Sequence, residues 1–142
     1  MIQGLLLDTH IAIWLGAADP RLRPRTRRAL DEAWATGMTV YLSPIVIWET
    51  AALASNGRVH LGCGIADWVG MLLDRPGTRE LPVTKEAAIA AFATPGLRHG
   101  DPADRLLVGC AIVAGCQLVT YDAKIVRFAR DHGAACGFSV MR

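Results

Sequence analysis

The sequence predicts an α/β fold in which helices cover both faces of a parallel sheet. Short apolar runs typical of buried strands alternate along the chain with longer segments of helical character. This alternation favours parallel strands, because each parallel pair needs a connection long enough for a helix. The chain has 142 residues, of which 52% are hydrophobic, so we expect one domain spanning residues 1–142 with a buried core.

The first elements follow one another without a long loop. Residues 2–7 form a short apolar run that ends abruptly at an acid, as expected for a buried strand. A helix is predicted over residues 10–16. A second helix, over residues 24–35, has its charged side chains on an exposed face and is closed by a glycine. Residues 39–42 are predicted to form the second strand.

The middle of the chain is predicted to be largely helical. Ser43 followed by Pro44 is a strong helix start, with serine as the N-cap and proline at the first helical position. This helix should extend to about residue 55. Further helices are expected over residues 67–74 and 84–93, with a short strand near residues 80–83.

The last third begins with another cap followed by proline, Asp101 and Pro102. The apolar helix that follows should end near residue 115. A strand over residues 118–120, a helix over 123–131 and a final strand over 138–141 complete the predicted fold.

Composition excludes several protein classes. The longest uninterrupted apolar run lies at residues 87–93, far shorter than the ~18 residues needed to span a membrane. The N-terminus lacks the basic region of a signal peptide. None of the 4 cysteines forms a Cys-x-x-Cys pair, which favours reduced thiols over a disulfide or a zinc site. We therefore expect a soluble, cytoplasmic protein without a membrane partner.

The basic residues are nearly all arginine, with only Lys85 and Lys124 as lysines among the 15. Arginine presents a planar fork that matches phosphate oxygens, so this bias favours an anionic partner. A GC-rich genome explains the same bias without any partner. The net charge of +2 does not decide between the two explanations.

Glu49 is the most informative acid, because it is the only charged residue between Pro44 and Gly57. Its neighbours three and four positions away on the predicted helix are all apolar. Burying an unpaired carboxylate costs several kcal/mol, roughly, so a cation, a metal ion or a proton should compensate it. The alternative is a glutamate at the edge of the apolar stripe whose carboxylate reaches solvent.

Three aspartates occupy positions where a sheet edge or a helix start is predicted. Asp8 and Asp122 each follow a predicted strand, at the end where ligands bind in open α/β sheets. Asp104 comes three residues after Asp101 at the start of an apolar helix. Helix capping is the alternative role for each of the three when it is considered alone.

Taken together, the four acids predict a divalent cation site. A doubly wound sheet can bring Asp8, Glu49, Asp104 and Asp122 to one edge, and no lysine or arginine lies within four residues of Asp8 or Glu49. Two carboxylates about 4 Å apart at an effective dielectric of about 20 repel by on the order of 4 kcal/mol. A hard cation such as Mg²⁺ is the simplest neutraliser, and such a site is suited to phosphodiester hydrolysis.

Four segments, in this order and spacing, resemble the PIN-domain ribonucleases and, among them, the VapC-type toxins of bacterial toxin–antitoxin systems. They are Leu-Leu-Leu-Asp-Thr-His at residues 5–10, Ser-Pro-Ile-Val-Ile-Trp-Glu at 43–49, His-Gly-Asp-Pro-Ala-Asp-Arg-Leu-Leu at 99–107 and Leu-Val-Thr-Tyr-Asp at 118–122. The resemblance covers essentially the whole chain. It implies a three-layer α/β/α domain with a central parallel sheet.

The resemblance also implies an activity and a site. The family's acidic residues correspond to Asp8, Glu49, Asp104 and Asp122, which would bind Mg²⁺ or Mn²⁺ and activate water for RNA cleavage, with Asp8 and Asp104 as the principal ligands. The residues expected to assist are Thr120 and Asp101 as supports of the site, and Arg98 and Arg105 as contacts to RNA. Solvated surface arginines are an equally good explanation of the last two. The implied partners are an RNA substrate, a small antitoxin protein and a second copy of the chain.

Other functions have weaker support in the sequence. A PIN fold that only binds RNA or protein is the main alternative, although the presence of all four acids argues against it. A phosphotransfer enzyme with Asp8 as nucleophile would have an acid two residues later, where this chain has His10. No serine lies in a Gly-x-Ser-x-Gly elbow, so a serine hydrolase is poorly supported. We interpret His10 and His99 as structural.

Overall fold

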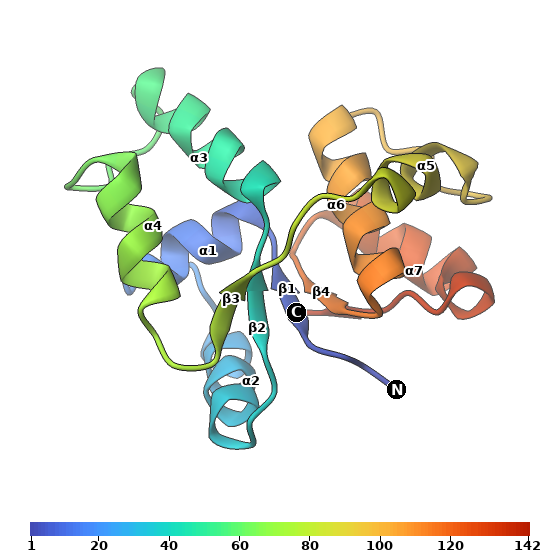
Figure 1. The fold of residues 1–142 in the computed structure, drawn as a ribbon, viewed down its shortest axis with the longest axis horizontal. Helices are drawn as coiled ribbons and strands as arrows, with labels where there is room; N and C mark the ends of the chain where they lie inside the picture. The colour runs from blue at the N-terminus through green and yellow to red at the C-terminus, as the bar shows by residue number, and fades with distance from the viewer.

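A sheet of 5 parallel strands forms the centre of the computed structural model, which describes residues 1–142 (Figure 1). The strands follow the order β3-β2-β1-β4-β5 across the sheet. Their bounds are β1 Leu5–Leu7, β2 Val40–Leu42, β3 Thr78–Glu80, β4 Gln117–Val119 and β5 Val140–Met141.

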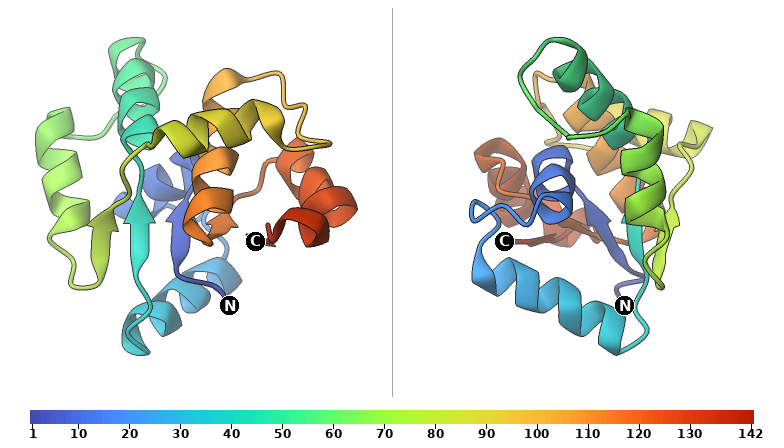
Figure 2. Two further views of the ribbon diagram at one scale, coloured as in Figure 1. Left: turned by 45° about the vertical axis from the view of Figure 1, so that its right-hand side comes forward. Right: turned by 90° about the vertical axis from the view of Figure 1, so that its left-hand side faces the viewer.

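Helices lie on both sides of this sheet (Figure 2), which gives three layers and confirms the predicted α/β/α fold class. Their bounds are α1 Thr9–Gly16, α2 Pro24–Ala35, α3 Pro44–Ser55, α4 Ile65–Leu73, α5 Lys85–Ala93, α6 Pro102–Ala114 and α7 Ala123–Cys136. None of these helices is both long enough and apolar enough to cross a bilayer.

The strand order places β1 at the point where the direction of winding reverses. The chain passes from β1 to β2 and β3 on one side, and then returns to β4 and β5 on the other. Residue Leu7 at the end of β1 pairs with Val119 at the end of β4, so the two strands finish side by side. In open α/β sheets this reversal point, beyond the carboxyl ends of the strands, is where ligands bind.

The short strands form the centre of the hydrophobic core. All of β1 is buried, as are Val40 and Leu42 of β2 and Leu118 and Val119 of β4, within a core cluster of 27 residues. Strands covered on both faces need apolar side chains on both faces, which explains why β1 is an uninterrupted run of leucines.

Several predicted elements differ in their bounds from the structure; the helix predicted over residues 67–74 lies at Ile65–Leu73, and the final strand predicted over 138–141 lies at Val140–Met141. The third strand was expected over residues 80–83 but lies at Thr78–Glu80, where Thr78 pairs with Val40 and Glu80 with Leu42. Pro82 has no backbone N–H and cannot continue such a ladder. The helix expected over 123–131 continues to Cys136 and ends where Gly137 takes the left-handed conformation. Within it, a Cβ on the buried Gly133 would overlap the carbonyl oxygen of Phe138.

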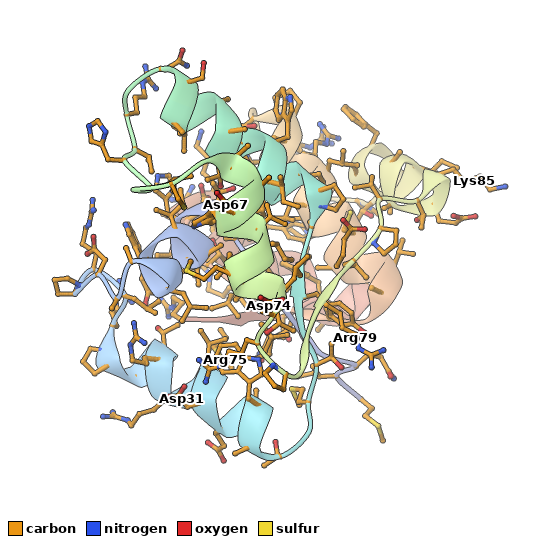
Figure 3. All side chains as sticks on the ribbon, turned by 60° about the vertical axis from the view of Figure 1, so that its left-hand side comes forward. Asp31, Asp67, Asp74, Arg75, Arg79 and Lys85 are labelled. Carbon is orange, nitrogen blue, oxygen red and sulfur yellow. The ribbon has the colours of Figure 1, made fainter.

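Arg75, directly after α4, lies next to α2 (Figure 3). Its guanidinium carbon lies 3.6 Å from the centroid of the Trp34 ring of α2. The same guanidinium lies 3.4 Å from Asp31 on the outer face of α2. Stacking on an indole is the stronger of the two contacts, because both partners of the ion pair are exposed to solvent.

Candidate metal centre

The four acids that the sequence singles out line one cavity of about 390 Å³. Asp8 follows β1 and Asp122 follows β4, while Glu49 comes from α3 and Asp104 from the first turn of α6. Asp101, the N-cap of α6, lines the same cavity. Acids that are up to 114 residues apart in sequence, from Asp8 to Asp122, thus meet at the reversal point of the sheet.

Asp8 is held through both carboxylate oxygens. Its Oδ1 accepts a hydrogen bond of 2.7 Å from the backbone N–H of Thr9, which caps α1. Its Oδ2 accepts one of 2.6 Å from the hydroxyl of Thr120. Burial raises the pKa of Asp8, and these two hydrogen bonds lower it in part. Capping and site formation are therefore compatible roles, because the cap occupies only one oxygen.

Thr120 links the ends of the two central strands. Its side chain is fully buried, and its hydroxyl donates to Asp8 while accepting a hydrogen bond of 3.0 Å from the backbone N–H of Asp122. Asp122 in turn caps α7, since its Oδ1 accepts from the N–H of Ile125 at 2.9 Å. One hydroxyl therefore sets the position of two of the acids.

Glu49 is partly buried on α3 and faces α1. The hydroxyl of Thr9 donates a hydrogen bond of 3.0 Å to its Oε1. Burial raises the pKa of Glu49; the hydrogen bond from Thr9 opposes this, and the charges of Asp8 and Asp101 add to it. The sequence gives no signal for this role of Thr9, because its partner lies 40 residues away.

Asp104 lies in the first turn of α6, among the other acids of the cavity. Burial raises its pKa, the charges of Asp8, Asp101, Glu49 and Asp122 raise it further, and together they bring it to about 7. Asp101 stands one turn earlier, where its Oδ1 accepts hydrogen bonds from the N–H groups of Ala103 and Asp104 at 2.9 and 3.3 Å. The predicted capping role of Asp101 is confirmed by this geometry.

His99 contacts two of the acids, a role that the sequence did not indicate. Its Nε2 lies 3.4 Å from Asp104 Oδ2 and 3.3 Å from Asp122 Oδ1. Its Nδ1 accepts a hydrogen bond of 3.0 Å from the backbone N–H of Asp101, so the ring carries its proton on Nε2. The imidazole is thus an N–H donor directed at both carboxylates.

The two arginines predicted to contact RNA occupy different surroundings. Arg98 is exposed and lines a second cavity beside His99. The Nε–H of Arg105 donates to the carbonyl oxygen of Ala91, and its guanidinium carbon lies 4.0 Å from the centroid of the Phe92 ring. Arg105 therefore engages α5 within the protein, and contact of either arginine with RNA stays a prediction.

The side chains in this cavity suit a divalent cation. Ligand oxygens of Glu49, Asp101 and Asp104 lie within 4.8 Å of one another, as do ligand atoms of His99, Asp104 and Asp122. No lysine or arginine forms an ion pair with any of the acids, and the imidazole of His99 contacts two of them. Clustered hard oxygen ligands without a lysine or arginine partner are the donor set that Mg²⁺ or Mn²⁺ binds.

Comparison with known proteins identifies a family, a relative and structures of similar fold. A family model described as PIN domain matches residues 5–131. The chain is 33% identical over 121 residues to Ribonuclease VapC22 of Mycobacterium tuberculosis (strain ATCC 25618 / H37Rv), covering 85% of this chain and 88% of that protein. The fold is similar to VapBC2 from Rickettsia felis bound to a DNA fragment from its promoter (TM-score 0.69, 18% identity, 99% of this chain and 98% of that chain). DNA-bound VapBC from Salmonella typhimurium is similar over the same shares of the two chains, with TM-score 0.59 and 18% identity.

Proposed function

This chain belongs to the PIN domain family, and on that basis we propose that it is a divalent-cation-dependent endoribonuclease that acts as the toxin of a toxin–antitoxin pair. The observation on which the proposal depends is the convergence of Asp8, Glu49, Asp104 and Asp122 in one cavity without a lysine or arginine partner. The carboxylates in this cavity repel one another, and a bound cation would relieve this repulsion and also bind phosphate oxygens. The ribonuclease activity of a relative at 33% identity agrees with this chemistry.

The cation would be Mg²⁺ or Mn²⁺, held mainly by Asp8 and Asp104, with Glu49 and Asp122 completing the acidic surroundings. When bound, it would lower the pKa of a water molecule and offset the charge that develops on the phosphate. Every residue offered to it is a hard oxygen ligand, except for the imidazole of His99, which is already turned toward two carboxylates through its N–H.

Side chains of the protein position the acids and accept the proton of the attacking water. Thr120 fixes the orientation of Asp8 through a bond of 2.6 Å, so the ligand oxygen does not have to be ordered when the cation or the substrate arrives. Thr9 holds one oxygen of Glu49, and the second oxygen can accept a proton from the attacking water. As the water oxygen bonds to phosphorus, the bond from phosphorus to the leaving ribose oxygen breaks, and that oxygen takes up a proton from solvent water.

The partners follow from the same family membership. An apolar groove of about 630 Å³ adjoins the metal centre and shares Glu49 and Asp101 with it. Trp48 and Leu53 line this groove, and the indole of Trp48 is 66% exposed. A segment of an antitoxin bound there would cover the acids and block access of RNA. We further propose that the chain is a single cytoplasmic domain that forms a homodimer.

The experiment that tests the proposed function is cleavage of total RNA by the purified protein with Mg²⁺ or Mn²⁺. We expect cleavage that EDTA abolishes, and that falls at least 100-fold, on the order expected for loss of a catalytic group, in Glu49→Gln. A matched control is Glu86→Gln on α5, which is exposed and outside the cavity. Cleavage that persists in Glu49→Gln, or that does not require a divalent cation, would contradict the proposal.

A further inference from the structure

A second cavity, of about 340 Å³, is lined by His99, whose Nε2 contacts two of the acids. It lies between the loop that joins α5 to α6 and residues 124–132 of α7, which Figure 2 shows next to each other. The loop packs closely on the helix here, because Gly96 sits against the ring of His132 and a Cβ at residue 96 would overlap that ring. The volume of this cavity lies within the range of about 300–1,000 Å³ that is typical of ligand sites.

The walls of this cavity are positively charged. Arg98 comes from the loop, and Lys124 and Arg127 come from successive turns of α7. None of the three forms an ion pair or a side-chain hydrogen bond within the protein. The single acid in the lining, Asp131, forms an ion pair with Arg130 at 2.8 Å, and this hydrogen bond and the charges of Arg130, His132 and Arg127 lower its pKa.

This cavity and the acidic one next to it carry opposite charge. The net charge of the chain is only +2, yet three unpaired cations gather in one hollow directly beside a cavity lined by five acids. His99 is the boundary between the two, since it lines the basic cavity while its Nε2 points at Asp104 and Asp122. A hollow lined by charges of one sign attracts a ligand of opposite charge.

We propose that this basic cavity, defined by Arg98, Lys124 and Arg127, binds phosphate groups of the single-stranded RNA next to the phosphate that is cleaved. The inference rests on the proposed ribonuclease function and adds the direction in which the strand leaves the metal centre: over His99 and along the first turns of α7. Arginine and lysine bind phosphate oxygens through charge-assisted hydrogen bonds, whatever the base sequence. The cavity therefore contributes affinity and register, and leaves the choice of bases to other surfaces.

An acidic protein segment is a less suitable occupant. Any strand that passes over His99 reaches the carboxylates of Asp104 and Asp122, which repel a peptide carboxylate. A phosphodiester at the same place is the group that a cation held by those carboxylates would bind. A polyanion with phosphates at regular spacing thus fits both cavities at once.

The test compares two double variants that remove the same charge. Lys124→Ala with Arg127→Ala takes two cations from the cavity, whereas Arg25→Ala with Arg28→Ala takes two exposed cations from α2, outside both cavities. The measurement is fluorescence anisotropy of a labelled single-stranded oligoribonucleotide in EDTA, so that no strand is cut, over a series of salt concentrations. We expect the cavity variant to bind about tenfold more weakly at 0.15 M salt, with a salt slope smaller by about 1.4. The α2 variant should bind within about twofold of the parent protein.

Equal losses in the two variants would show that only net charge matters and would overturn the proposal, as would an unchanged affinity in the cavity variant. Competition by polyglutamate as strong as that by RNA at equal charge would overturn it in favour of an acidic protein. Mn²⁺ binding measured by calorimetry should be the same in the cavity variant as in the parent protein. If the parent protein cleaves RNA while the cavity variant binds normally, the inference fails and the proposed function stands. If the cavity variant loses RNA affinity but the parent protein cleaves no RNA, the proposed function fails instead.

Discussion

Replacing Asp104 by asparagine should stabilise the metal-free protein at pH 8, although it removes a ligand of the proposed cation. The reason is the pKa of Asp104, which the buried, acidic surroundings raise from 3.8 to about 7. A carboxyl whose pKa is higher in the folded than in the unfolded state binds protons more tightly in the folded protein. Its ionisation therefore costs no stability below pH 4, costs progressively more as pH rises from about 4 to about 7, and costs the full amount above that.

The size of the effect can be worked out from the site. The difference between a pKa of 3.8 and one of about 7 corresponds to about 4 kcal/mol of unfolding free energy at high pH. The side chain of Asp104 remains 17% exposed, and water screens part of the repulsion, so we expect about 2 kcal/mol. Asparagine also loses about 0.5 kcal/mol of favourable interaction with the N-terminus of α6. The net gain of about 1.5 kcal/mol corresponds to a rise of about 5 °C in Tm.

The assay is thermal unfolding in EDTA between pH 4 and 8. We expect the parent protein to lose stability over this range, and Asp104→Asn to follow a flatter curve that crosses it. Asp31→Asn, on the exposed face of α2, should change the free energy of unfolding by no more than about 0.5 kcal/mol at any pH. If Asp104→Asn is less stable than the parent at pH 8, or if both show the same pH dependence, the repulsion between the clustered acids is not the cost that we infer.

Three further outcomes follow from the same contacts. Mg²⁺ or Mn²⁺ at ten times its Kd should raise the unfolding free energy of the parent protein by about 1.4 kcal/mol, measured by thermal unfolding. A similar rise in Asp8→Asn would contradict the role of Asp8 as a ligand of the cation. Thr120→Val removes the donor to Asp8 and leaves the N–H of Asp122 without its acceptor. Urea unfolding should therefore show a loss of about 1–3 kcal/mol in the free energy of unfolding, and RNA cleavage should be slower. Cleavage at the parent rate would contradict the positioning role of Thr120. Gly109→Ala should lower the free energy of unfolding by about 1–3 kcal/mol, because its methyl group would overlap the carbonyl oxygen of Ala87 between α5 and α6. The rate of RNA cleavage per folded molecule, measured on the soluble fraction, should stay unchanged.

Local signals in the sequence are sufficient for those parts of the fold that depend on neighbouring residues. The helix α3 begins at Pro44 and ends at Ser55 as predicted, because the hydroxyl of Ser43 accepts the N–H of Ile45 at 3.1 Å and proline fixes the first turn. Pairing between strands is not local, and so the position of β3 was missed: it is set by the match of Thr78 to Val40.

The same distinction applies to the candidate site. The acids could be identified because each lies in a recognisable local context, namely the end of a strand, the start of a helix or an apolar helical face. His99 could not, because its contact with Asp122 spans 23 residues and depends on how the loop before α6 folds back over α7. The basic cavity depends on the same loop, which explains why Arg98 alone was a weak signal in the sequence.

The most direct test of the account is to locate a metal ion in crystals grown with Mn²⁺ by its anomalous scattering. We expect a peak in the cavity at the ends of β1 and β4, bonded to carboxylate oxygens of Asp8 and Asp104 at about 2.0–2.2 Å. A map with no peak there at saturating Mn²⁺, or with its peak outside the reach of both aspartates, would contradict the claim that these acids are gathered to hold a cation.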